Sequence, residues 1–350
     1  MHYLPKGLAD RFGTNGKKLG KVLAVLASFM ILFFGLFGGN LFQVNQSYAQ
    51  LVSVTGGEDG LMGSSAGALF FGILIAALVG IVLLGGIRSI ANVTSTLVPA
   101  MAGIYITACL VAILVHVTAV PAAIGTIIEG AFNPKGVAAA ARRPDHRLQA
   151  GRVSNEAGLG SAPIAHSAVK TKHPASEGLV ALLEPFIDIV VTCTMTALTI
   201  VIANPASWAE ARKSGGGDIG GVTITSDAFE TVLPWFPYIL TVAVMLFAIS
   251  TVLTWGYYGL KAWTHLFGRS RASELTYKVV YTLFAVTGSL LTLQTLIDMA
   301  DAVLFMLAVI NIIGLYLLAP VVKRELTPSW SSSAPATPAR SPTVTKTRSR

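Results

Sequence analysis

The sequence predicts an all-α polytopic membrane protein with about eight transmembrane helices. Of its 350 residues, 53% are hydrophobic and only 12% are charged, whereas soluble globular chains carry roughly 25% charged residues. The mean hydropathy is +0.67. The apolar residues also come in runs of about 20, the length that crosses a bilayer as a helix. We therefore expect a membrane domain over residues 1–326, followed by a disordered cytoplasmic tail over residues 327–350, which is rich in Pro, Ser, Thr and Arg.

The apolar runs define the expected spans in order. They are Leu19–Leu51, Ala66–Ile87, Leu97–Val117, Pro121–Phe132, Glu177–Ile202, Pro234–Trp263, Tyr277–Leu296 and Ala302–Val322. The fourth run is about half of a normal span, so we expect it to be tilted, broken or re-entrant.

The basic residues predict the orientation. They gather before the first span, around Arg88, in residues 135–172, in residues 261–271 and after the last span. Every strongly basic loop falls on one side if the fourth run crosses, which places both termini in the cytoplasm. A basic stretch leading into a full-length span is no cleavable signal peptide. The expected location is the plasma membrane, which in a bacterium is the inner membrane.

Several function classes find no support in the residues. The net charge is +8, but no basic face with interleaved aromatics indicates nucleic acid. Cys109 and Cys193 lie in apolar runs and are expected to be small buried hydrophobes. The chain has no CxxC or His-rich spacing for a transition metal, no GxSxG or HExxH for a hydrolase that would use Ser161 and His166, and no phosphate loop. We expect no catalytic residues, no enzyme and no ATP-driven pump.

The fifth run contains Glu184-Pro185-Phe186-Ile187-Asp188 near its middle. Ionisable groups at membrane depth are costly and usually functional. Proline frees backbone carbonyls, and broken membrane helices build ion and substrate sites. The segment predicts such a site, with a kinked helix and locally paired acids as the alternative.

Two further polar groups are candidates. Asn40, Gln43 and Ser47 share one helical face of the first span, as spacing i, i+3 and i+7 requires. Their amides suit a zwitterionic solute, although interhelical hydrogen bonding explains them equally well. In the sixth run Thr251 and Trp255 share a face beside Ser250. Their hydroxyls suit a hard cation, and periodicity alone favours helix packing.

Five strings together resemble the alanine/glycine:cation symporter family. They are SNEAGLGSAPIAHSAVKT (154–171), FIDIVVTCTMTALTIVI (186–202), STVLTWGYYGLKA (250–262), GGNLFQVNQ (38–46) and the DxxDAVLFMLAVINIIGL stretch that starts at Asp298. The resemblance runs from the first span to about Lys323 and implies a LeuT-type inverted-repeat fold with broken helices and a midplane site.

The resemblance also implies a function and site residues. The function is symport of a small neutral amino acid, alanine or glycine, with Na⁺ as the coupling ion and H⁺ as an alternative. Gln43, Phe186, Thr251 and Trp255 would bind substrate, and Ser250 or Thr251 would bind the cation. Asn40, Glu184 and Asp188 would be buried polar or gating groups.

Two departures from the family pattern leave an alternative open. Compared with the family pattern, we expect the LeuT-type fold to be incomplete at the N-terminus, where the family has a glycine-rich broken helix, and Ala138–Val153 is rich in arginine and proline where the family has a glycine-rich apolar stretch. A truncated or frameshifted, non-transporting family member would explain both. Alanine against glycine, the isomer, the coupling ion and the oligomeric state stay open at this point.

Overall fold

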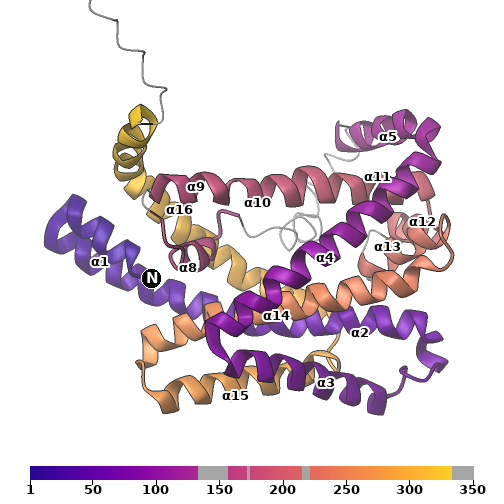
Figure 1. The fold of residues 1–350 in the computed structure, drawn as a ribbon, viewed down its shortest axis with the longest axis horizontal. Helices are drawn as coiled ribbons and strands as arrows, with labels where there is room; N and C mark the ends of the chain where they lie inside the picture. Colours follow the sequence, from indigo (N-terminus) through magenta and orange to yellow (C-terminus); the bar gives the residue numbers. More distant parts are fainter. Residues whose placement is uncertain (133–156, 172–173, 215–220, 333–350) are drawn as a thin grey trace, which may run out of the picture.

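The computed structural model describes residues 1–132, 157–171, 174–214 and 221–332. Within these ranges every regular element is a helix and none is a strand, which confirms the all-α prediction (Figure 1). Six stretches are long and apolar enough to cross a membrane, so the chain is a polytopic membrane protein. They are Tyr3–Val54, Ser65–Leu84, Gly86–Val115, Pro174–Ala203, Phe236–Phe267 and Thr295–Arg324.

The first span is longer than the predicted Leu19–Leu51. It comprises α1 (Tyr3–Leu36), a π-helical segment η1 (Phe37–Leu41) and α2 (Phe42–Val54). Within α1 the backbone of Gly13 has φ +60°, a conformation that few residues other than glycine adopt. The chain reverses there, because Gly16 and Gly20 pack against the backbone of Leu8 and Leu4. The N-terminal turns of α1 therefore fold back on the helix that follows.

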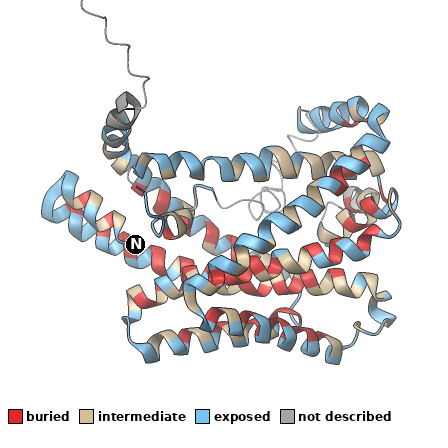
Figure 2. Ribbon diagram, in the orientation of Figure 1, coloured by how far each residue is buried: buried red, intermediate tan, exposed pale blue. Residues whose placement is uncertain are grey.

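Helix α14 (Phe236–Phe267) lies at the centre of the core and packs against α1, α2 and η1. The largest cluster of buried side chains joins α1, α3 (Ser65–Leu84), α14 and α15 (Arg271–Gly288). In Figure 2 the buried residues concentrate along these helices. Trp255, Tyr277 and Tyr281 are the largest fully buried side chains there.

The predicted span Tyr277–Leu296 is not one helix, which is a correction to the expected topology. Helix α15 starts earlier, at Arg271, and ends at Gly288 before α16 begins at Leu293. Asn45 of α2 explains the break, because its Nδ2 donates to the carbonyl oxygens of Gly288 at 3.3 Å and Leu291 at 2.7 Å. These bonds satisfy carbonyls that a continuous helix would use internally.

A second, smaller core lies at one end of α14. It joins Cys109 and its neighbours in α4 (Gly86–Val115) to Phe229 of α13 (Gly221–Glu230) and Phe236 of α14. After α4 come the short 3-10 helix η3 (Val117–Ala119) and the 13-residue helix α5 (Val120–Phe132), and α5 corresponds to the half-length fourth run. Helix α4 starts at Gly86, eleven residues before Leu97, where the third span was predicted to begin.

The predicted fifth span is an interrupted helix. It comprises α9 (Pro174–Ala181), α10 (Leu183–Pro185), the π-helical η4 (Phe186–Cys193) and α11 (Thr194–Ala203). The remaining elements are η2 (Gly57–Asp59), α8 (Ala162–His166), α12 (Ala206–Ser214) and α16 (Leu293–Ser332). Helix α16 extends beyond residue 327, where the tail was expected to begin. Three predicted stretches lie outside the described residues: residues 333–350 of the expected tail, the arginine-rich Ala138–Val153 and Ser154–Glu156.

Candidate functional site

Trp255 lies where α14 meets the glycines of the first span. Its side chain is only 2% exposed and packs edge-on against Phe34, with ring centroids 4.5 Å apart. A Cβ atom on Gly39 would overlap the Trp255 ring, and one on Gly35 would lie 3.4 Å from the Trp255 carbonyl oxygen. The small residues let the two backbones approach closely, as is typical between membrane helices.

The same contacts show in which direction the two helices run relative to one another. Gly35 faces both Trp255 and Gly259, and Gly39 faces Trp255, so the helices run antiparallel. One further turn along each helix leads to Gln43 on one side and Thr251 on the other. Both are partly buried. Gln43 and Thr251 thus follow the Trp255 contact by one helical turn on two antiparallel helices, and Ser250, next to Thr251, is buried.

The Gln43 amide is weakly engaged at this interface. Its Nε2 lies 3.5 Å from the carbonyl oxygen of Gly38, at the outer limit of a hydrogen bond. Ser250 donates instead to Phe247 in its own helix at 2.9 Å. Gln43 thus keeps hydrogen-bonding capacity that a polar solute could use.

A buried polar seam runs along η1 and α2. Asn40 is fully buried, and its Nδ2 donates to the carbonyl oxygen of Tyr281 at 2.8 Å, but its Oδ1 has no hydrogen-bond partner within the described residues. Asn40 lies in the π-helical η1, and such segments recur at functional sites. An unsatisfied buried acceptor is costly and calls for an explanation, and a bound cation would satisfy it.

Gln50, at the far end of this seam, is a buried polar residue that was not predicted from the sequence. Gln50 is fully buried, and its Nε2 lies 3.0 Å from Ser226 Oγ and 3.3 Å from Thr241 Oγ1. A signal was available, because Gln50 continues the spacing of Asn40, Gln43 and Ser47 at i+10. Ser226 and Thr241 carry no comparable sequence signal.

Phe186, Glu184 and Asp188 lie apart from this interface. Phe186 is 54% exposed, no residue of η4 is buried, and η4 packs mainly on α10 and α11. Figure 1 shows α9 and α10 along one edge of the molecule, away from α14. Glu184 has a side chain that is 67% exposed, with Oε2 4.0 Å from His166 Nε2. Pro185 coincides with the start of the π-helical η4, which agrees with the predicted interruption.

The described part of the SNEAG-containing string has a packing role. Nδ2 of Asn311 in α16 donates to the Gly158 carbonyl oxygen at 2.6 Å, and Tyr3 donates to Asn311 Oδ1 at 3.2 Å. His166 Nδ1 lies 2.6 Å from Glu177 Oε1. Through these contacts the string links α8 to α1, α9 and α16. His166 contacts the carboxylate of Glu177, and within the described residues no nucleophile is seen paired with it as in a hydrolase.

The comparison with known sequences now decides the family. The sequence profile described as the sodium:alanine symporter family matches residues 1–337. The chain belongs to the sodium:alanine symporter family. This family resemblance was predicted from the motifs and is confirmed.

Individual relatives agree with the family. The chain is 36% identical over 327 residues to the sodium/alanine symporter AgcS of Methanococcus maripaludis, covering 93% of this chain and 67% of that protein. It is 31% identical to the amino-acid carrier protein AlsT of Bacillus subtilis, covering 91% and 63% respectively. The probable sodium/glutamine symporter GlnT of Bacillus subtilis is 26% identical, with 92% and 62% covered.

These relatives set the functional class. The family consists of sodium-coupled amino-acid symporters, so this chain is a transport protein of the membrane and not an enzyme. The chain spans about two thirds of the length of the relatives it matches. Their names point to transport and give no support to the alternative of a non-transporting member.

Proposed function

We propose that this protein carries a small neutral amino acid, alanine or glycine, across the plasma membrane together with Na⁺. Substrate binds at the interface of α2 and α14, where Gln43 contacts the zwitterion and Trp255 walls the pocket. Thr251 contacts substrate or, with Ser250, the cation. The observation that supports the proposal is the antiparallel packing of Gly35 and Gly39 on Trp255 and Gly259, from which one further helical turn leads to Gln43 on one helix and to Thr251 on the other.

Asn40 supports a cation near this interface. Its buried Oδ1 has no hydrogen-bond partner in the described part of the chain, and amide oxygens are hard ligands. Gly39, next to Asn40 in η1, contacts Trp255 one turn from Thr251 on α14. A cation bound here would order η1 and α14 together, so substrate would bind more tightly in its presence, and the reverse holds by linkage.

The segment from α9 to η4 supplies the moving part of this proposal. Phe186, Glu184 and Asp188 lie away from α14, and Phe186 and Glu184 are exposed while Asp188 is partly buried. In a LeuT-type inverted-repeat fold with about eight crossings in this chain, one bundle rocks against another around the site. Movement of η4 toward α14 would place Phe186 over the substrate and change access to the acids.

The orientation is part of the proposal too. The basic loops support cytoplasmic termini, and a bacterial inner membrane fits that arrangement. Hydroxyl and amide oxygens at the interface favour Na⁺, and Glu184 and Asp188 would relay protons if H⁺ were the coupling ion.

Uptake into proteoliposomes tests the proposal. An inward Na⁺ gradient should drive accumulation of labelled alanine, and replacing Na⁺ with choline should abolish it, whereas a proton gradient alone should not substitute. Unlabelled glycine and D-alanine should be added as competitors to rank substrates. No sodium-dependent accumulation by folded, reconstituted protein would refute the activity.

Matched variants then test the residues. Thr251→Val should reduce sodium-dependent uptake at least about tenfold, because loss of a hydrogen bond to a charged group costs roughly 1.5–3 kcal/mol. Thr254→Val is the control, since Thr254 donates to Ser250 within its own helix at 2.9 Å. Equal effects of the two substitutions would remove Thr251 from the site.

A further inference from the structure

A cavity of about 270 Å³ opens between α3, α4, α14 and α15. On α14 it is lined by residues from Tyr257 to Thr264, toward the C-terminal end of the helix. Gln43, Thr251 and Trp255 do not line it, so it is separate from the proposed substrate site. Its volume is close to the lower end for small-molecule sites, about 300 Å³.

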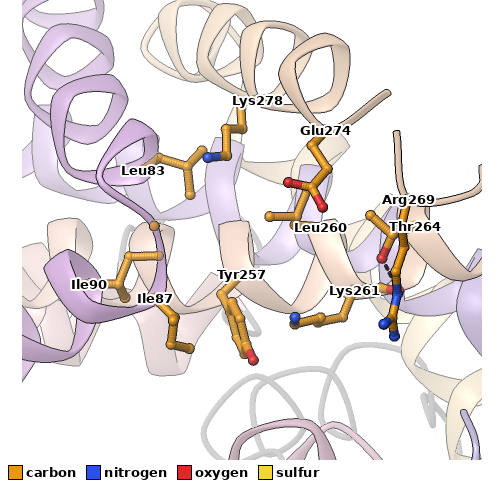
Figure 3. A pocket seen from close by; sticks show the side chains of 11 residues that line it. Leu83, Ile87, Ile90, Tyr257, Leu260, Lys261, Thr264, Arg269, Glu274 and Lys278 are labelled. Atoms are coloured by element: carbon orange, nitrogen blue, oxygen red, sulfur yellow. Dashed lines mark hydrogen bonds between the residues drawn. The ribbon is translucent and has the colours of Figure 1, made fainter. Parts of the chain in front are cut away.

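The polar wall of this cavity is predominantly cationic. Lys261 comes from α14, Arg269 from the turn after it, and Lys278 from α15, and among the described residues that line the cavity the one acid is Glu274. Figure 3 shows Lys261 and Arg269 at one side of the cavity, with Lys278 and Glu274 extending from the helix above. Three cations outnumber one carboxylate, so the cavity favours an anion.

The positive charge of the cavity also acts on neighbouring groups outside it. His2 and His265 contact edge-on, with ring centroids 5.2 Å apart. Burial lowers the pKa of His2, and the charges of the terminal ammonium, Arg269 and Lys6 lower it further. The electrostatic effect of Arg269 thus reaches beyond the cavity itself.

The opposite wall is apolar and open to the outside. Leu83, Ile87, Ile90 and Leu260 line it, and Ile87 is 46% exposed. Helix α3 ends just before this wall and α4 starts at Gly86, where a Cβ atom would meet no described atom within 4 Å. An occupant would therefore have a charged end among the cations and an apolar part along α4.

The cationic wall is held in place by packing. Trp263 Nε1 donates to Ser273 Oγ at 2.9 Å, and the Ser270 side chain caps the start of α15 by accepting from Ser273 N–H at 3.1 Å. Lys261 Nζ lies 5.0 Å from the Tyr257 ring centroid, within cation–π range. The turn between α14 and α15 thus presents its cations on an ordered frame.

We propose that this cavity binds the phosphodiester headgroup of an anionic lipid, with the acyl chains along Ile87 and Ile90. A basic pocket between membrane helices on the cytoplasmic side is suited to such headgroups. The basic loop of residues 261–271 lies on the side predicted to be cytoplasmic. A free phosphate would share the cationic contacts but would leave the apolar wall unused.

Native mass spectrometry of the purified chain tests this with phosphatidylglycerol, phosphatidylcholine and inorganic phosphate as probes. Phosphatidylglycerol should bind in preference to phosphatidylcholine. The triple substitution Lys261→Gln, Arg269→Gln and Lys278→Gln should weaken phosphatidylglycerol binding at least about tenfold. The matched control is Lys17→Gln, Lys18→Gln and Lys21→Gln, which removes the same charge from exposed positions of α1 and should change binding less than about twofold.

A single substitution in the opposite direction protects the test against misfolding of the triple variant. Glu274→Gln removes the one carboxylate and should tighten phosphatidylglycerol binding by about two- to threefold. Equal weakening by both triple variants, or no change in any of them, would overturn the site. Inorganic phosphate that displaces the lipid at equal concentration would overturn the lipid assignment. Because binding is measured without transport, the outcome is independent of the uptake experiment.

Discussion

The central pair of α1 and α14 and the edge segment Pro174–Ala203 are both apolar enough to span a membrane, yet they pack very differently. In each of the two spans that contain α1 and α14, 50% of the most apolar 18-residue stretch is buried, whereas in the edge segment this share is 6%. The central pair carries glycines at its contacts, such as Gly35, Gly39 and Gly259. The edge segment instead exposes large side chains, among them Leu182 and Phe186.

This difference separates two physical requirements. Apolarity is enough to place a helix in lipid, because lipid tails are as apolar as leucine. Close association needs small residues that allow backbones to approach. The central pair should therefore be the stable frame, and the edge segment should move at lower cost, as elements with few buried contacts do.

The largest expected effect comes from removing the side chain at the middle of the frame. Trp255→Ala should destabilise the protein by about 3 kcal/mol, the lower end for a buried aromatic, because lipid solvates apolar groups and mainly packing is lost. Phe186→Ala, at a 54% exposed position, should cost under about 1 kcal/mol. Thermal unfolding in detergent, followed by size-exclusion chromatography, compares the two.

Measuring alanine uptake by the same two variants sharpens the comparison. Phe186→Ala should reduce alanine uptake while leaving the unfolding midpoint nearly unchanged, since Phe186 is proposed to act on substrate only after movement of η4. Similar losses of stability in both variants would show that the edge segment is packed as firmly as the frame.

The next effect concerns the glycine contact itself. Gly39→Ala should cost about 1–3 kcal/mol, the range for overpacking, because its Cβ would overlap the Trp255 ring. Gly103→Ala in α4 is the matched control, where no described atom lies within 4 Å of the added methyl, and alanine should stabilise that helix slightly. The same unfolding assay compares them, and a neutral Gly39→Ala would mean that α1 and α14 are not closely packed.

The sequence was a good guide to helices and a poor guide to where they pack. Apolar length predicted α3, α5 and most of α14 within a few residues. It failed for Tyr277–Leu296, because the break depends on Asn45, which is distant in sequence and donates to carbonyls at the turn. It also missed the reversal at Gly13, since one glycine in a basic stretch gives no apolar signal.

The candidate site was predictable in part for the same reason. Local spacing places Gln43 on the same face of the first span as Asn40 and places Thr251 on the same face of α14 as Trp255, and the antiparallel packing at Gly35 and Gly39 shows how these two spans run past one another. The separation of Phe186 from them depends on which helices pack closely, a tertiary property that no local spacing contains. Helical periodicity therefore identifies faces, while the glycine contacts decide which faces meet.

The smallest expected effect tests how much the hydrogen bonds of the buried polar seam add to the stability of the central helices. Gln50→Leu removes an amide that lies within hydrogen-bond distance of Ser226 and Thr241, and it also removes the unsatisfied Gln50 Oε1. Because interhelical hydrogen bonds in membranes average about 0.6 kcal/mol, the net loss of stability should be below about 1 kcal/mol. Gln46→Leu on the same helix is the control and should be near neutral, since its amide donates to the adjacent Asn45 at 3.1 Å. Thermal unfolding of the two variants measures the difference. A loss of stability above about 2 kcal/mol for Gln50→Leu alone would show that the polar seam, and not the glycine contacts, contributes most to the packing of α2 against α14.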